Sequence, residues 1–291
     1  MGLYVSCTSL QNDERSTALR GCPAQPETGE DNGILIFSVW KLRALLLTAP
    51  AIILATVVMG IISMLTSVWD STGFTQHRLA RRWSRILLAV GFVRCRVSGI
   101  EKLDPSRGYV LVANHASFYD TPAILTSIPL QFRFYAKHSL FSIPLLGGHL
   151  KRAGHLPVIR DDPRSSLKTM SEGARIVRDR RVSLLLFPEG GRTPVQMRPF
   201  KEGAAYIAIK AGVPIVPIGL VGTRRVLPMG SMMVRGGDIE IVVGDPIETE
   251  GLTIRDRAEL NQRLQDQVVA MAHETMGADD RAANSMKQEI R

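Results

Sequence analysis

Residues 44–68 form a run of 25 positions without a charged side chain, and this run constrains the 291-residue chain more than any other feature. About 20 apolar residues suffice to cross the hydrocarbon region of a bilayer as a helix. A buried core helix is rarely apolar on all sides over such a length, and a cleavable signal peptide has a shorter apolar region. The run predicts a membrane helix, although Pro50 and Gly60 leave open a bent segment that enters only one leaflet.

The charges on either side of this run predict its orientation. The nearest positive residues are Lys41 and Arg43 before the run, and Arg78, Arg81, Arg82 and Arg85 after it. Because positive charge is enriched on the cytoplasmic side, we expect the C-terminal side, with the rest of the chain, to be cytoplasmic. Residues 77–93 mix arginines with apolar residues, so this second helix either lies in the lipid interface or packs on the following domain.

The overall charge indicates an anionic partner. The chain has 36 Lys and Arg against 27 Asp and Glu, a net charge of +9, which fits a nucleic acid, a phosphorylated metabolite or an anionic lipid. Nucleic acid is disfavoured, because aromatic residues make up 6% and no recognition motif is present. Cys7, Cys22 and Cys95 are too few and too scattered for a disulfide framework or a four-cysteine zinc site, so we expect no metal.

The chain after residue 93 has the sequence pattern of an α/β domain. Short apolar runs alternate with segments of helical spacing, which predicts a largely parallel sheet covered by helices. The runs are residues 109–113, 132–136, 155–159, 183–187, 214–218 and 239–243, and the main helical segments are 163–180, 201–211 and 253–276. Pro214 and Pro217 suggest that their strand is short or at a sheet edge. We therefore expect a disordered tail (1–31), a membrane helix with an amphipathic helix (32–93), the α/β domain (94–276) and a loose tail (277–291).

Ligands of an open α/β sheet sit at the carboxyl ends of the strands, and His115 follows the first of the runs. Its imidazole can exchange protons near neutral pH. Asp120 comes five residues later, so direct contact requires a turn at His115 that leads into a helix, for which Ser117 is a suitable cap. Asp120 is then either a simple helix-start acid or the carboxylate that orients the imidazole of a general base.

A second polar segment follows the run at 183–187. Gly190 and Gly191 allow close backbone approach to an anion, and Arg192 adds a planar charged group suited to phosphate. A plain Gly-Gly turn beside a solvated arginine is the alternative. The sequence contains neither a Gly-x-Ser-x-Gly elbow nor a phosphate loop, which disfavours covalent serine catalysis and nucleotide hydrolysis.

Four blocks together resemble the lysophosphatidic acid acyltransferase (1-acylglycerol-3-phosphate O-acyltransferase) family. They are Asn114-His115-x-x-x-x-Asp120, Gly154 to Arg160, Phe187-Pro188-Glu189-Gly190-x-Arg192 and Val213 to Pro217. The resemblance implies a glycerol-phosphate acyltransferase-like α/β fold, with His115 as general base and Asp120 as its orienting partner. It also implies a substrate site made by Asn114, Lys137, Arg160, Glu189, Gly190 and Arg192, with Arg160 and Arg192 on the phosphate.

The resemblance further implies a membrane-bound enzyme that acylates the sn-2 hydroxyl of lysophosphatidic acid and makes phosphatidic acid. The acyl donor is an acyl-CoA or an acyl carrier protein, and no cofactor is expected. Gly191 stands where the family usually has threonine, and Ile159 stands where it usually has an acidic or polar residue. Another lysolipid acceptor is therefore an alternative within the class. A membrane-anchored adaptor that holds anionic lipid without catalysis is the alternative from a different class.

Overall fold

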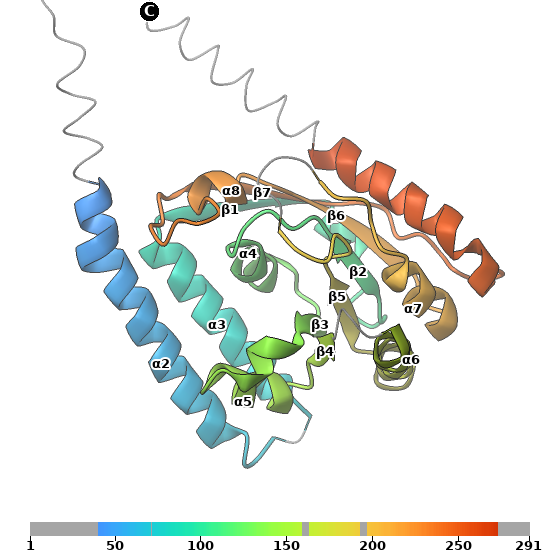
Figure 1. Cartoon of the computed structure of the whole chain (residues 1–291), viewed down its shortest axis with the longest axis horizontal. Coiled ribbons are helices and arrows are strands. Elements are labelled where there is room, and N and C mark those ends of the chain that lie inside the picture. Colours follow the sequence, from blue (N-terminus) through green and yellow to red (C-terminus); the bar gives the residue numbers. More distant parts are fainter. Residues whose placement is uncertain (1–39, 71, 159–162, 193–196, 273–291) are drawn as a thin grey trace, which may run out of the picture. The chain divides into compact units, whose positions relative to one another are not determined.

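The computed structural model describes residues 40–70, 72–158, 163–192 and 197–272 (Figure 1). The predicted tails at 1–31 and 277–291 lie outside these residues. Within them, one helix is long and apolar enough to cross a membrane by length and composition, Trp40–Thr66, and it includes a π-helical turn, Ala44–Thr48, followed by α2, Ala49–Thr66. Only 6% of its apolar window is buried in the protein, so nearly all of this surface faces outward.

The second helix, α3 (Phe74–Val90), is amphipathic and packs on α2, on α4 (Asp120–Ser127) and on the first strand. Its buried face includes Leu79, Leu87 and Leu88, whereas Arg78, Arg82 and Arg85 are exposed. Of the two roles expected for this helix, packing on the domain is therefore confirmed for its apolar face. These three arginines form an exposed arginine stripe, which is accessible to a charged surface.

Seven strands of the described chain form a single sheet in the order β1-β7-β6-β2-β5-β3-β4. All neighbouring pairs are parallel except β6 and β7, which confirms the predicted α/β class with a largely parallel sheet. The strands are β1 (Val93–Ser98), β2 (Val110–Ala113), β3 (Phe132–Lys137), β4 (Leu156–Val158), β5 (Ser183–Leu186), β6 (Ile215–Val221) and β7 (Gly237–Val243). The expected start of the domain, residue 94, falls within β1.

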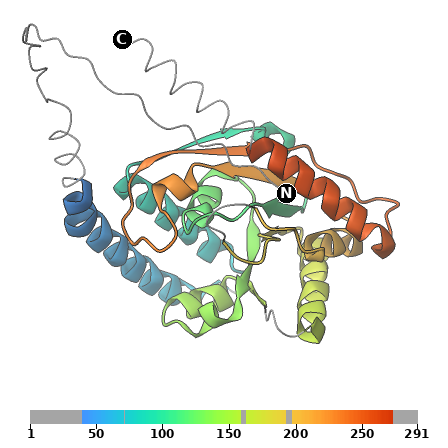
Figure 2. The same ribbon diagram turned by 45° about the horizontal axis from the view of Figure 1, so that its top comes forward.

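Helices lie on both faces of this sheet (Figure 2). A cluster of apolar side chains packs between the sheet and the helices on each face. Alternate residues of β2 point to opposite faces, so Leu111 belongs to the cluster under α3 and α4, and Val110 and Val112 to the other. The second cluster is closed by α6 (Pro163–Arg180), α7 (Gly203–Ala211) and a helix over residues 257–272. The remaining helices are α5 (Leu146–Arg152), α8 (Thr223–Val226) and the 3-10 turns Ile100–Lys102, His138–Ser142 and Ile254–Asp256.

The prediction that Pro217 lies in a short or edge strand is wrong. It sits in β6, a seven-residue strand between β2 and β7. The carbonyl of Pro217 accepts a hydrogen bond from the Gly244 amide, just beyond the end of β7. A strand residue directs its N and C=O to the same side, so the nitrogen of Pro217 faces the place where β7 has ended. The missing N–H therefore takes no bond from the pairing with β2, and at most one from the end of the pairing with β7.

Candidate active site

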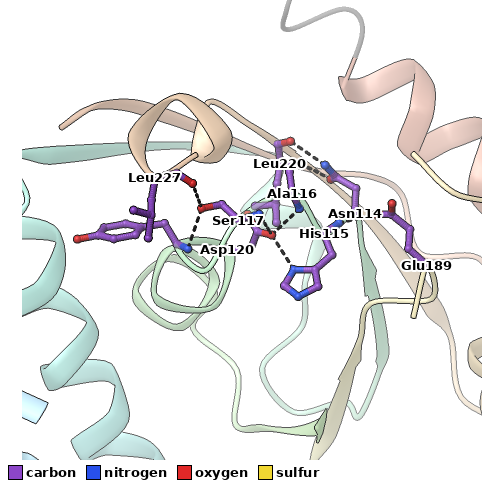
Figure 3. A network of polar contacts seen from close by, with 9 residues as sticks. Asn114, His115, Ala116, Ser117, Asp120, Glu189, Leu220 and Leu227 are labelled. Atoms are coloured by element: carbon purple, nitrogen blue, oxygen red, sulfur yellow. Dashed lines mark hydrogen bonds and ion pairs between the residues drawn. The ribbon is translucent and has the colours of Figure 1, made fainter. Parts of the chain in front are cut away.

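The candidate site lies where β2 and β5 end side by side. These strands are adjacent and parallel, so the residues that follow them meet at the same edge of the sheet (Figure 3). The His115 backbone N–H donates to Glu189 Oε1 at 2.6 Å, which joins the polar segment after β2 directly to the one after β5. Two sequence blocks more than 70 residues apart thus form one site, as the strand pattern predicts.

Asp120 orients the imidazole of His115. The distance from His115 Nδ1 to Asp120 Oδ2 is 2.7 Å, and the carboxylate is fully buried. The same oxygen also accepts the backbone N–H groups of Ala116, at 2.7 Å, and Ser117, at 2.9 Å. Asp120 is the first residue of α4 as well, so it is both the helix-start acid and the partner of the imidazole.

The expected cap at Ser117 is wrong in detail. The helix begins at Asp120, and no side chain caps it through a hydrogen bond. Ser117 Oγ instead donates to the Leu227 carbonyl at 2.9 Å and accepts the Tyr119 N–H at 3.2 Å. The hydroxyl therefore ties the turn between His115 and Asp120 to the segment after α8, a long-range contact that the Ser-x-x-Asp spacing could not reveal.

The ring of His115 stacks on Phe187, with 4.1 Å between ring centroids and an interplanar angle of 17°. Its side chain is 20% exposed. Because Nδ1 is bound to a carboxylate, it carries the ring proton of the neutral form, and Nε2 is the nitrogen that can accept one. The geometry provides a partly exposed base held between an aromatic ring and a buried carboxylate.

Asn114 and Glu189 have different roles from the substrate contacts expected of them. Asn114 Nδ2 donates to the Leu220 carbonyl at 2.9 Å, and the Leu220 N–H donates to Asn114 Oδ1 at 2.7 Å. Glu189 Oε2 accepts the Arg198 N–H at 3.0 Å, so both its oxygens hold backbone amides. Burial raises the pKa of Glu189, while these hydrogen bonds oppose the rise. Both side chains fix the backbone around His115.

Arg192 lies close to Asp120 and packs on Phe118. Its Cζ is 3.3 Å from the centroid of the Phe118 ring, a cation–π contact. Burial lowers its pKa, and the negative charge of Asp120 opposes that shift. Gly190, two residues earlier, has a φ of +70°, a conformation that glycine adopts without a steric cost. The turn therefore holds a guanidinium against the Phe118 ring and within electrostatic range of Asp120.

The two remaining predicted substrate residues are Lys137 and Arg160. Lys137 is the last residue of β3 and is exposed, and Arg160 lies outside the described residues. Among the residues that the structure describes, no group of three His, Cys, Asp or Glu side chains is arranged to hold a metal ion. Reasoning from the sequence missed Phe118 and Phe187 as parts of the site, because their apolar character suggests only core packing.

The sequence of the α/β domain and the fold are both similar to those of known acyltransferases. Residues 94–221 match the model of the family described as Acyltransferase. The fold resembles that of the 1-acyl-sn-glycerophosphate (LPA) acyltransferase PlsC from Thermotoga maritima, with a TM-score of 0.69, 24% identity, and coverage of 81% of this chain and 98% of that one.

Two relatives of this chain are also named 1-acyl-sn-glycerol-3-phosphate acyltransferases. The chloroplastic 1-acyl-sn-glycerol-3-phosphate acyltransferase BAT2 of Brassica napus is 36% identical over 59% of this chain, and the corresponding enzyme of Limnanthes douglasii is 28% identical over 80%. The matches cover 50% and 83% of those proteins, so the chain spans about half the length of the first. The chain is therefore similar, over its α/β domain, to proteins named as 1-acyl-sn-glycerol-3-phosphate acyltransferases.

Proposed function

We propose that the protein transfers a fatty acyl group from a thioester, acyl-CoA or acyl carrier protein, to the sn-2 hydroxyl of lysophosphatidic acid. The product is phosphatidic acid. The observation that carries this proposal is the 2.7 Å contact between His115 Nδ1 and buried Asp120, with Arg192 close to Asp120. The names of the relatives support the choice of acceptor.

The reaction follows from this arrangement. His115 Nε2 takes the proton of the acceptor hydroxyl as its oxygen attacks the thioester carbonyl. The new C–O bond forms, the C–S bond breaks, and the leaving thiolate receives the proton from the imidazolium. Asp120 stabilises the imidazolium between these steps, and a positioned base of this kind is typically worth 10²- to 10⁴-fold in rate. Arg192, with Arg160 and Lys137, binds the acceptor phosphate.

The long apolar helix supports binding to a membrane surface. Its 27 residues make a helix about 40 Å long. Near one end, Arg43 Nη2 donates to the Arg235 carbonyl at 3.2 Å, and near the other, Ser63 Oγ is 2.7 Å from His149 Nδ1. A helix that contacts the same domain near both ends cannot place those ends on opposite sides of a bilayer.

We therefore favour the alternative in which this helix enters one leaflet through its exposed face. Leu46 and Leu54 on that face are 66% and 64% exposed. The arginine stripe of α3 would then lie at anionic headgroups, since each basic residue near such a surface adds about 1 kcal/mol. We propose the cytoplasmic face for the catalytic domain, because anionic lipids that attract basic residues are concentrated in the cytoplasmic leaflet.

The acyltransferase proposal is tested by transfer of a labelled acyl group from acyl-CoA, and separately from acyl carrier protein, to lysophosphatidic acid. We expect His115→Ala to lose at least 99% of the rate. His138→Ala, which changes an exposed histidine in a 3-10 turn, should retain it. No transfer by the unmodified protein to any lysolipid, with binding to anionic vesicles intact, would favour the adaptor instead.

Membrane binding is tested by co-sedimentation with vesicles that contain anionic phospholipid. Leu46→Glu combined with Leu54→Glu should release most of the protein, because two apolar contacts are replaced by charges that the lipid repels. Leu167→Glu, at a 49% exposed leucine of α6, serves as the matched control and should stay bound. Equal sedimentation of all variants would contradict insertion through α2 and its preceding turn.

A further inference from the structure

Lys201 lies against the same Gly-Gly turn that carries Arg192. A methyl group placed on Gly190 would come within 3.2 Å of Lys201 Cε and 3.3 Å of Lys201 Nζ. The lysine side chain therefore extends across Gly190, one residue from Glu189, whose carboxylate binds the His115 backbone. An ammonium group is thus placed at the turn that supports the base.

This placement is fixed by three hydrogen bonds from two parts of the fold. The Lys201 N–H donates to the Pro188 carbonyl at 3.0 Å. The preceding residue, buried Phe200, is held at both backbone groups by the helix over residues 257–272. Its N–H donates to Gln265 Oε1 at 2.9 Å, and its carbonyl accepts from Asn261 Nδ2 at 2.8 Å. The backbone that carries Lys201 is therefore held at consecutive residues, which reduces the entropy lost when the ammonium binds a ligand.

The ammonium group of Lys201 forms no ion pair with any residue that the structure describes, and the side chain is exposed. Glu189, the nearest carboxylate in sequence, already uses both oxygens for backbone amides. A cation that is held at a glycine turn without a protein partner is suited to a ligand anion.

We propose that Lys201 binds the phosphate of the acceptor lipid, on the Gly190 side of the turn, together with Arg192. This inference rests on the proposed function. The chemistry favours the acceptor over a CoA donor, since only two carbons and one ester oxygen separate the reacting hydroxyl of lysophosphatidic acid from phosphorus. In acyl-CoA the whole pantetheine arm separates the phosphates from the thioester, so those phosphates lie far from the carbonyl that meets His115.

The test compares Lys201→Ala and Lys201→Arg with the unmodified protein and with Lys168→Ala, a matched control at an exposed lysine of α6. Steady-state kinetics are measured with lysophosphatidic acid, with 1-acylglycerol, which lacks the phosphate, and with varied acyl-CoA. Lys201→Ala should raise the KM for lysophosphatidic acid about tenfold or more, as expected for loss of one charge-assisted hydrogen bond. Lys201→Arg should recover part of it, and the KM for acyl-CoA and the rate with 1-acylglycerol should not change.

Equilibrium binding of lysophosphatidic acid in detergent micelles separates this inference from the proposed function. Weaker binding by Lys201→Ala, in a protein that transfers no acyl group, would refute the acyltransferase proposal and retain the lysine site. Active enzyme with the same KM and binding in Lys201→Ala would overturn the lysine site. A rise confined to the KM for acyl-CoA, or a Lys201→Arg variant no better than Lys201→Ala, would overturn it as well.

Discussion

Two buried histidines and one half-buried histidine should make the fold sensitive to mild acid. His77, on α3, is 1% exposed, and its ring packs edge-on against Phe132 with 4.7 Å between centroids. Burial lowers its pKa to about 3, and the positive charges of Arg133 and Arg81 contribute. Neither ring nitrogen has a hydrogen-bond partner within the described chain. The folded protein therefore keeps this imidazole neutral where the unfolded chain would protonate it.

The other two histidines are on neighbouring elements. Burial lowers the pKa of His149, on α5, to about 4. It lowers the pKa of His155, just before β4, well below the ordinary value of 6.5, with His149, Arg133 and His77 adding positive charge. The Nδ1 of His155 accepts the Phe134 N–H at 2.9 Å, a bond that a protonated ring cannot make. The three rings thus share the region between α3, α5 and the strands β3 and β4 at one edge of the sheet.

The size and sign of the effect follow from linkage. Each folded pKa is depressed, so its contribution to stability is complete above about pH 6.5 and is lost as pH falls towards the folded value. At pH 5.5 an imidazole with an unfolded pKa near 6.5 is about ten-to-one protonated, which lowers the free energy of unfolding by about 1.4 kcal/mol for each group. Three such groups together should lower the free energy of unfolding by about 4 kcal/mol when the pH falls from 8 to 5.5.

The assay is guanidinium unfolding of the detergent-solubilised protein at several pH values between 8 and 5.5. His77→Phe keeps an aromatic ring against Phe132 and removes one titrating group. Between pH 8 and pH 5.5, the free energy of unfolding of this variant should therefore fall by about 1.4 kcal/mol less than that of the unmodified protein. Ser84→Ala, at another buried polar position of α3, should shift stability by the same amount at every pH. Identical pH dependence for His77→Phe and the unmodified protein would refute this reasoning.

Three further predictions concern the active site. Asp120→Asn should lower kcat by orders of magnitude, because an amide cannot stabilise the imidazolium, while co-sedimentation with vesicles stays normal; a near-normal rate would contradict the role of the carboxylate. Gly190→Ala should raise the acceptor KM and cost about 1 kcal/mol of stability, since it puts a side chain at positive φ and displaces Lys201; unchanged kinetics would argue against that contact. Asn114→Ala leaves the buried Leu220 N–H and carbonyl unpaired, so guanidinium unfolding should report a loss of about 2 to 4 kcal/mol, and a loss below 0.5 kcal/mol would mean that the paired bonds contribute little.

The sequence predicts much of the sheet because buried strands are short and continuously apolar. The runs that became β2 and β5 are buried at every position, so their composition alone identifies them. β1 escaped notice because only its first residue is buried and it carries Arg94 and Arg96. The place of Pro217 was mispredicted because whether a proline costs a ladder bond depends on where the neighbouring strand ends.

The site residues divide in a similar way. The His115–Asp120 pair could be predicted, since a five-residue spacing with a turn brings the two side chains together. The roles of Asn114 and Glu189 could not be predicted. Both side chains bind backbone groups of residues distant in the sequence, and such contacts cannot be inferred from the residue types. Lys201 was not singled out, since one lysine near a helix start resembles any solvated surface charge until its position over Gly190 is known.

The carboxylate oxygen of Asp120 that faces His115 does not depend on the imidazole for its position. Besides the imidazole, it is held by two backbone amides, so removal of the imidazole leaves the carboxylate anchored and the turn before α4 intact. His115→Ala should therefore be an inert receptor with its substrate groups still in place. Such a protein can be held indefinitely with both acceptor and donor present, so the order and affinity of their binding become measurable without turnover.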